Sequence, residues 1–234
     1  MGAIIKREIL AYFSSAIGYI VLAVFYVFGG FYFYMSALVS NTTDLSYTFS
    51  SLFIILMFII PILTMRLFSE EKKQKTDQAL LTAPVSLTSI ALGKYFAAIV
   101  MYLCCIAITL VYAGIIACYN APSWTSVFGN FLGVFLLGSA LIAVGMFLSS
   151  ITENQIVAAI GGIAVGVLML FMDSIAQAVS VGFIGNILRG ISFMTYYNNF
   201  TLGIVTLKDV VFFVSVSALF VFLTVRVFEK KRWS

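Results

Sequence analysis

The sequence contains no histidine, only three cysteines and three prolines, and few charges, since 9% of its 234 residues are charged. The missing histidine removes the commonest metal ligand and the usual general base near neutral pH. All three cysteines, at 104, 105 and 118, lie in one apolar segment, which favours a packing role over a disulfide framework or a metal site. A soluble domain carries about a quarter charged residues, whereas 62% of this chain is hydrophobic. We therefore expect a polytopic membrane protein that does not bind nucleic acid.

The common catalytic and nucleotide-binding patterns are missing as well. A G-x-x-x-x-G-K-[ST] loop cradles phosphates, but the nearest string, Gly93-Lys94-Tyr95, lacks both the first glycine and the hydroxyl. Neither G-x-S-x-G nor H-E-x-x-H occurs. We therefore predict that this chain has no catalytic residue and binds no metal or cofactor by itself.

Long uncharged runs predict an all-α membrane protein with six transmembrane helices, because a helix needs about 20 apolar residues to cross a bilayer. The run from Tyr95 to Thr152 holds no charge and is interrupted only by Asn120-Ala-Pro-Ser-Trp124. Proline and asparagine break helices, so this run holds two spans and one turn. The expected spans are about 17–39, 46–65, 94–118, 126–149 and 156–172, with a last span after residue 207.

The segment 173–207 is apolar but broken by glycines, and Arg189 lies at its middle. It is either a seventh span or a set of short external re-entrant helices before the last span. With six spans, one side of the membrane receives two basic residues near the start, five between 66 and 94, and four after residue 225. The positive-inside rule then favours six spans with both termini in the cytoplasm of a cell (inner, or cytoplasmic) membrane.

The first residues, 1–16, precede the first span and contain both charges and apolar residues. Ile5, Ile9 and Tyr12 share a helical face, while Lys6 and Arg7 lie off it. This pattern predicts an N-terminal interfacial helix lying along the membrane. A frayed start of the first span is the alternative.

A charged island follows the second span, in the predicted cytoplasmic loop 66–94. Ser69 is expected to cap a helix that begins at Glu70-Glu71, because carboxylates favour the positive N-terminus of a helix, and Pro84 is expected to stop it. The result is a short amphipathic helix over about 69–83. The alternative is a solvated loop that anchors the protein by its positive charges.

The island resembles the loop after the second span in ABC-2-type permeases, the membrane subunits of ABC exporters. Their pattern runs roughly R-x-x-x-E-E-x-x-x-G-T-x-E-x-L-L-x-x-P. Lys75 stands where glycine is usual, and Asp77 stands where glutamate is usual. The matching residues are Arg66, Glu70, Glu71, Thr76, Leu80, Leu81 and Pro84.

Three further passages resemble the gliding-motility and nitrous-oxide-accessory branch of that family, and with the island they cover nearly the whole chain in order. They lie at 6–21, from Lys6-Arg-Glu8; at 149–159, from Ser149-Ser-Ile-Thr-Glu-Asn; and at 191–211, ending in Lys208-Asp-Val-Val211.

The resemblance implies one transmembrane domain, 1–234, that pairs with a second permease subunit, the same or a related chain, and with two copies of an ABC ATPase. ATP and Mg²⁺ would be bound by that ATPase. The 69–83 helix would be a coupling helix seated in a groove of the ATPase. Its acids Glu70, Glu71 and Asp77 would contact basic residues there, with Leu80 and Leu81 as an apolar knob.

Several other residues are assigned roles on the same basis. Arg66 is expected to be an interfacial anchor or a link between the second span and the coupling helix. Glu153 is expected in a cytoplasmic turn that approaches the ATPase. The polar and aromatic group Tyr196, Tyr197, Asn198 and Asn199 is predicted to line an external gate, with interfacial aromatic anchoring as the alternative.

Two other function classes stay open at this point. One is an ATP-independent carrier or channel, which is disfavoured because no predicted span has a charge near its centre. The other is a membrane anchor subunit of a larger ABC-type machine that does mechanical or assembly work without export.

Overall fold

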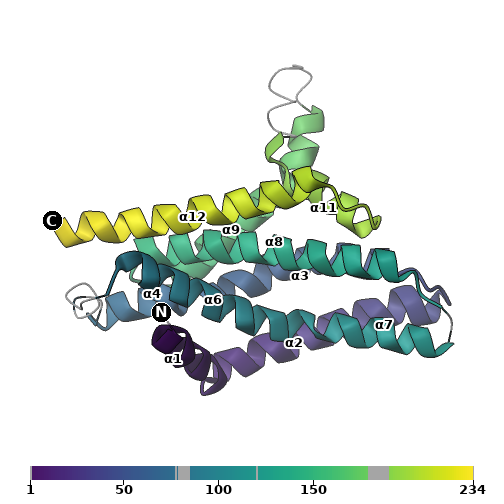
Figure 1. Cartoon of the computed structure of the whole chain (residues 1–234), viewed down its shortest axis with the longest axis horizontal. Coiled ribbons are helices and arrows are strands. Elements are labelled where there is room, and N and C mark those ends of the chain that lie inside the picture. Colours follow the sequence, from purple (N-terminus) through teal and green to yellow (C-terminus); the bar gives the residue numbers. More distant parts are fainter. Residues whose placement is uncertain (1, 77, 79–84, 120, 179–189, 234) are drawn as a thin grey trace.

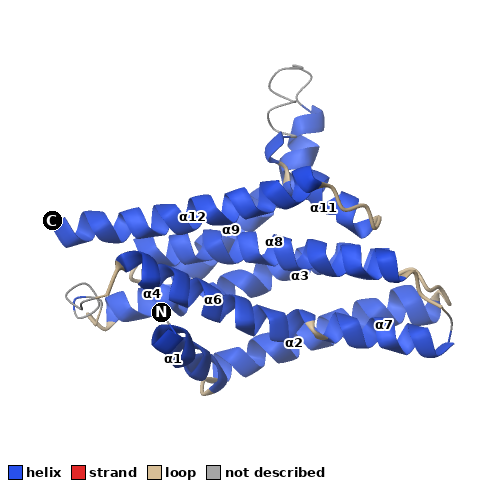
Figure 2. Ribbon diagram, in the orientation of Figure 1, coloured by secondary structure: helices blue, strands red, loops and turns tan. Residues whose placement is uncertain are grey.

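The structure is a computed structural model of the whole chain, and it describes all residues except 1, 77, 79–84, 120, 179–189 and 234. The described residues form helices joined by short loops, without a strand (Figures 1 and 2). The helices are α1 (Gly2–Phe13), α2 (Ala16–Phe33), the π-helix η1 (Tyr34–Val39), α3 (Ser46–Thr64), α4 (Arg66–Lys73), α6 (Leu87–Ile106), α7 (Ile108–Tyr119), α8 (Trp124–Ile151), α9 (Gln155–Ala178), α11 (Phe193–Thr201) and α12 (Leu207–Trp233).

Six helical stretches of the described chain are long and apolar enough to cross a membrane, as predicted. They are 16–39, 46–73, 87–119, 124–151, 155–176 and 207–232. The protein is therefore an all-α, multi-pass membrane protein. α3 and α8 are the most buried of these stretches, whereas α2, α9 and α12 leave most of their surface exposed.

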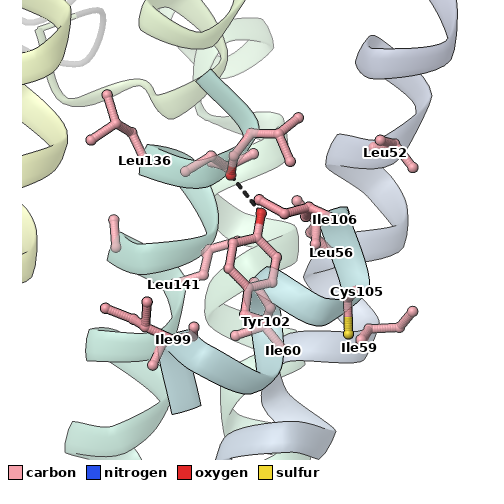
Figure 3. Close-up of a cluster of buried hydrophobic side chains, with 14 of the residues drawn as sticks. Leu52, Leu56, Ile59, Ile60, Ile99, Tyr102, Cys105, Ile106, Leu136 and Leu141 are labelled. Carbon is pink, nitrogen blue, oxygen red and sulfur yellow. Dashed lines mark hydrogen bonds between the residues drawn. The ribbon is translucent and has the colours of Figure 1, made fainter. Parts of the chain in front are cut away.

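α8 is the central helix, and it contacts α3, α6, α9, α11 and α12. Its neighbours α3 and α6 enclose a core of large apolar side chains around Tyr102, which is fully buried (Figure 3). The Tyr102 hydroxyl donates to the backbone oxygen of Val134 at 2.5 Å, so this phenol does not remain unpaired in an apolar interior. Figure 3 labels Leu52, Leu56 and Ile60 of α3 in the same cluster of buried side chains.

Several helix limits differ from the prediction. α6 begins at Leu87 instead of Lys94, because Ser86 caps it by accepting a hydrogen bond from Ser89 N at 3.3 Å. α9 continues to Ala178 instead of ending near Met172, since nothing in that stretch breaks a helix. Helices therefore occupy both ends of the predicted 66–94 loop and the start of the predicted 173–207 segment.

Two short helices lie beside the six long stretches. α1 is a helix of its own that packs on α6, so the chain does not simply begin with a frayed first span. α11 is nine residues long and packs on α8, α9, α3 and α12. Nine residues rise only ~14 Å, too little to cross a bilayer, so α11 is not a seventh span. Arg189 lies outside the described residues.

Both termini, α1 and α4 lie at the same end of the bundle, at the left of Figure 1. We call it the α4 end. The turn between α7 and α8 lies at the opposite end (Figure 1).

Candidate functional site

The charges of three helices meet at the α4 end in one compact group. Lys94 on α6 lies between two carboxylates, with Nζ 3.1 Å from Glu8 Oε1 on α1 and 2.9 Å from Glu71 Oε1 on α4. Arg7 Nη2 lies 2.6 Å from the same Glu8 oxygen and 2.9 Å from the same Glu71 oxygen. We call Arg7, Glu8, Glu71 and Lys94 the four-charge cluster. Its charges balance, which offsets the cost of burying Lys94 and of covering most of the two carboxylates, whereas the Arg7 side chain is 57% exposed.

Burial differs among these four groups. The Lys94 side chain is 2% exposed, and its ammonium also lies 5.1 Å from the centre of the Phe68 ring. Burial pushes the pKa of the Glu8 carboxyl upward, but the charges and hydrogen bonds of Lys94 and Arg7 together outweigh this and lower the pKa. The hydrogen bond to Glu8, opposed by partial burial, raises the pKa of Arg7. Both pKa shifts favour the ionised forms of Glu8 and Arg7.

Arg66 joins α4 to the end of α1. Its Nη2 donates to Ala11 O at 3.0 Å and its Nη1 to Ser15 Oγ at 2.8 Å, while Nε lies 3.7 Å from Glu70 Oε2. The Ala11 carbonyl lies in the last turn of α1, where backbone oxygens lack helical partners, so the arginine acts as a cap. Tyr12 adds a second tie, because its hydroxyl donates to Leu63 O at 3.0 Å. Arg66 therefore connects α4 to α1.

α8 holds the other side of α4. Ser149 Oγ accepts hydrogen bonds from the backbone nitrogens of Phe68 and Ser69, both at 3.1 Å, and donates to Met65 O at 2.9 Å. One hydroxyl thus bridges the junction between α3 and α4. The Lys72 ammonium donates to the backbone oxygen of Ser150, at the negative C-terminal end of α8.

The predicted coupling helix differs from the structure at both ends. Ser69 is not an N-cap, because it lies buried inside α4 and its hydroxyl donates to Met65 O. The second span continues almost directly into α4, so this helix begins at Arg66 and places Glu70 and Glu71 in its second half. It ends at Lys73, so no single helix runs over 69–83.

The end of α4 has a specific geometry. Lys75 adopts a left-handed conformation with φ +56°. Thr76 N donates to Glu71 O at 3.0 Å and Lys75 N to Lys72 O at 3.1 Å, which are the two hydrogen bonds of a Schellman motif. Lysine therefore occupies the position where glycine is usual. Asp77, Leu80, Leu81 and Pro84 lie outside the described residues.

The predicted acidic contacts divide into one buried and two accessible groups. The Glu71 side chain is 16% exposed and belongs to the four-charge cluster, whereas the Glu70 side chain is 40% exposed. Glu153 is exposed in the turn between α8 and α9, three residues after Ser150. Among the described residues, Glu70 and Glu153 are thus the accessible acids of the predicted set at this end.

The predicted gate residues do not form one exposed patch. Tyr197 is fully buried, and its hydroxyl donates to Phe49 O on α3 at 2.6 Å. Tyr196 is buried too and stacks on Phe212, with ring centres 4.0 Å apart. Asn199 Nδ2 donates to Asp209 Oδ2 at 2.9 Å, which leaves only Asn198 exposed. The four residues therefore share no exposed surface, and the two aromatic rings anchor α11 to α3 and α12. Their role at an external gate stays a prediction.

The sequence interpretation gave Arg7, Glu8 and Lys94 no role at the candidate site. A signal was present nonetheless, since Lys94 is a single cation at the edge of a long apolar run, and a charge in such a place needs a partner. The acidic residue of the first helix, Glu8, is one of its two partners.

A model of the ABC-2 family, described as an ABC-2 family transporter protein, matches residues 5–171, which is most of the chain. The chain belongs to this family. A comparison with the curated proteins finds no match. The match includes α1, α4, α6 and α8, and therefore every helix that contributes to the four-charge cluster and to the ties of α4. The ABC-2 protein is thus a transmembrane component of an ABC transporter, a class of subunit that is normally not catalytic itself.

Proposed function

We propose that this ABC-2 protein is the permease subunit of an ABC exporter in the cell (inner) membrane, with both termini in the cytoplasm. Separate ATPase subunits, two copies that hold ATP and Mg²⁺, would supply the energy. A second permease subunit, the same or a related chain, would complete the transport path. The gliding-motility and nitrous-oxide-accessory branch is the part of the family that its motifs resemble.

The observation that carries this proposal is how α4 is mounted. The four-charge cluster and Arg66 tie it to α1 and α6, and Ser149 with Lys72 ties it to α8. A helix held on two sides moves its neighbours when it is pushed. Shifting a conformational equilibrium from 1:99 to 99:1 takes about 5.5 kcal/mol, and a rigidly mounted helix is able to transmit a difference of that size.

The accessible groups at the α4 end would provide the docking surface for the ATPase. Glu70, Thr76 and Glu153 are its described members. We propose that Asp77, Leu80, Leu81 and Pro84 complete it. Arg66 and Glu71 would not contact the ATPase. They would contribute to coupling by holding α4 on α1 and α6. An external gate would depend on the position of α11. The residues that would influence it are Asn198 and, behind it, Tyr196, Tyr197 and Asn199.

A pull-down of the intact complex, followed by mass spectrometry, tests this function. We expect an ATPase subunit to co-purify with the wild-type chain. The Glu70→Lys variant should lower its recovery about tenfold or more, since a mispaired interface charge costs a few kcal/mol. Asp44→Lys, an exposed acid between η1 and α3, is the matched control and should leave recovery unchanged.

Glu71→Lys is unsuitable for this test, because it would place a third cation beside Arg7 and Lys94 and damage the fold. Absence of any ATPase from the purified complex would contradict the proposal, and so would equal recovery with Glu70→Lys and Asp44→Lys. Association with an ATPase but no ATP-dependent export would identify the chain as a subunit of a machine that does mechanical or assembly work.

A further inference from the structure

A groove with a volume of about 670 Å³ lies between α6 and α12, with α8 forming its floor. Most of its lining side chains are aliphatic or aromatic, including Leu92 and Ile99 on α6 and Val214 and Val221 on α12. Polar groups gather at one end, where Thr88, Arg226 and Glu229 line it.

The length of the groove indicates what fits into it. The apolar lining on α12 runs from Val214 to Val225, which lie 11 positions apart, and the rise of ~1.5 Å per residue gives ~17 Å between them. The hydrocarbon core of a bilayer is ~30 Å thick, so the apolar part of the groove covers about one leaflet. A second membrane-spanning helix needs about 20 residues and would extend far beyond it. One acyl chain matches this length.

The polar end lies at the depth of α4. Phe228, close to Arg226 in sequence, packs against Phe68 in a tilted arrangement with ring centres 4.6 Å apart, and the Lys72 ammonium lies 5.9 Å from the Phe228 ring centre. The end of the groove is therefore level with the charged side chains of α4, where the lipid headgroups of that leaflet would lie.

Arg226 and Glu229 present opposite charges side by side. Arg226 Nη1 lies 2.5 Å from Glu229 Oε2, and the guanidinium also lies 4.8 Å above the Phe222 ring, which fixes its direction. A guanidinium has five N–H donors, so the bond to Glu229 leaves donors for a phosphate. The neighbouring carboxylate repels a second negative charge and attracts an ammonium.

We propose that this groove is a binding site for an amine-bearing phospholipid such as phosphatidylethanolamine. One acyl chain lies between α6 and α12, the phosphate accepts hydrogen bonds from Arg226, and the headgroup ammonium pairs with Glu229. The lipid fills the space between α6 and α12, and it thereby makes the packing of the bundle sensitive to the composition of the membrane.

Native mass spectrometry of the detergent-purified chain, titrated with phosphatidylethanolamine and phosphatidylglycerol of identical acyl chains, tests the site. We expect a bound phosphatidylethanolamine in preference to phosphatidylglycerol. Arg226→Gln should weaken binding of both lipids about tenfold, the effect of losing a hydrogen bond to a charged group. Glu229→Gln should remove the preference while leaving phosphatidylglycerol binding intact or stronger. Arg232→Gln, near the end of the same helix and outside the groove, is the control and should change nothing.

Two further variants test the apolar part. Ala218→Trp fills the groove and should abolish binding of the acyl chain, whereas Leu219→Trp places the same side chain on the neighbouring exposed position and should not. Equal lipid binding by both tryptophan variants, or by Arg226→Gln and the wild type, would overturn the proposal. Cross-linking of Ala218→Cys to a second protein chain in the membrane would overturn it as well, because the groove would then seat a protein.

Discussion

Lys94 Nζ lies 2.9 Å from Glu71 Oε1, which joins α6 to α4 through a lysine side chain that is only 2% exposed. Glu8 shares this ammonium, so one buried cation holds carboxylates from two other helices. The network makes α1, α4 and α6 depend on each other. Five predictions follow, three from this network and two from the backbone and packing elsewhere in the protein.

Replacing Lys94 by methionine should destabilise the protein by about 3 kcal/mol, because the largely covered carboxylates of Glu8 and Glu71 then keep only the more exposed Arg7 as partner. The measurement is unfolding in detergent, followed by the reaction of a thiol dye with the buried Cys105 in a background where Cys104 and the exposed Cys118 are replaced by alanine. Lys73→Met, at an exposed position of α4, is the control and should cost less than about 1 kcal/mol.

Neutralising the two acids together with the lysine should recover part of the loss. The triple variant Lys94→Met, Glu8→Gln, Glu71→Gln buries no unpaired charge, and it should be more stable than Lys94→Met alone. A triple variant that is no more stable would show that the ion pairs are not the cause.

Acidification should loosen α1 through Glu8. Its carboxyl has a pKa below its ordinary value of 4.5, because Lys94 and Arg7 outweigh the effect of burial. The unfolded chain therefore binds the proton more readily than the folded one in this range. The stabilisation is complete above pH 4.5 and is lost as the pH falls through the lowered pKa. Unfolding midpoints measured on both sides of that value should show this loss. Glu8→Gln should be less stable at neutral pH and lose less on acidification; an identical pH dependence in both proteins would contradict the assignment.

Lys75→Gly should stabilise the protein by about 1 kcal/mol. The backbone at this position is left-handed, with φ +56°, which costs an L-residue other than glycine ~1–2 kcal/mol, partly offset by the greater freedom of glycine in the unfolded chain. Lys73→Gly, two residues earlier and inside α4, should instead destabilise by about 1 kcal/mol. Effects of the same sign in urea unfolding of the two variants would argue against the Schellman geometry.

Gly138→Ala should destabilise the bundle by about 1–3 kcal/mol, the usual effect of overpacking. A Cβ atom at 138 would lie 2.1 Å from Cζ of Tyr102. That ring has little freedom to move, since its hydroxyl is held by Val134 O. Gly114→Ala is the control, because a Cβ there meets no atom within 4 Å, and it should be neutral or stabilising. Equal melting temperatures of the two variants would contradict this packing.

The number of spans and the all-α class could be predicted from the sequence, because each rests on the length and charge of apolar runs. The contacts inside the candidate site could not be predicted in this way. Ser69 lies near the start of the charged island, and serine is a common N-cap residue. The helix nevertheless continues through it, because the hydroxyl of Ser149, 80 residues away, hydrogen-bonds the backbone at Met65 and Ser69. Likewise, the hydroxyl and ring of Tyr197 suit an interface, yet a backbone oxygen of α3 and an aromatic neighbour draw it inside. Such partners are distant in sequence, and local patterns do not reveal them.

The serine that bridges the α3–α4 junction decides where a force applied at α4 is felt. The Ser149 hydroxyl, near the C-terminal end of α8, hydrogen-bonds three backbone atoms at this junction, namely Phe68 N, Ser69 N and Met65 O. A force applied at α4 thus reaches the central helix α8 directly, as well as α1 and α6 through the four-charge cluster. α3 and α12 both pack on α8, so they would shift together with it, and the movement would not have to pass through a loop.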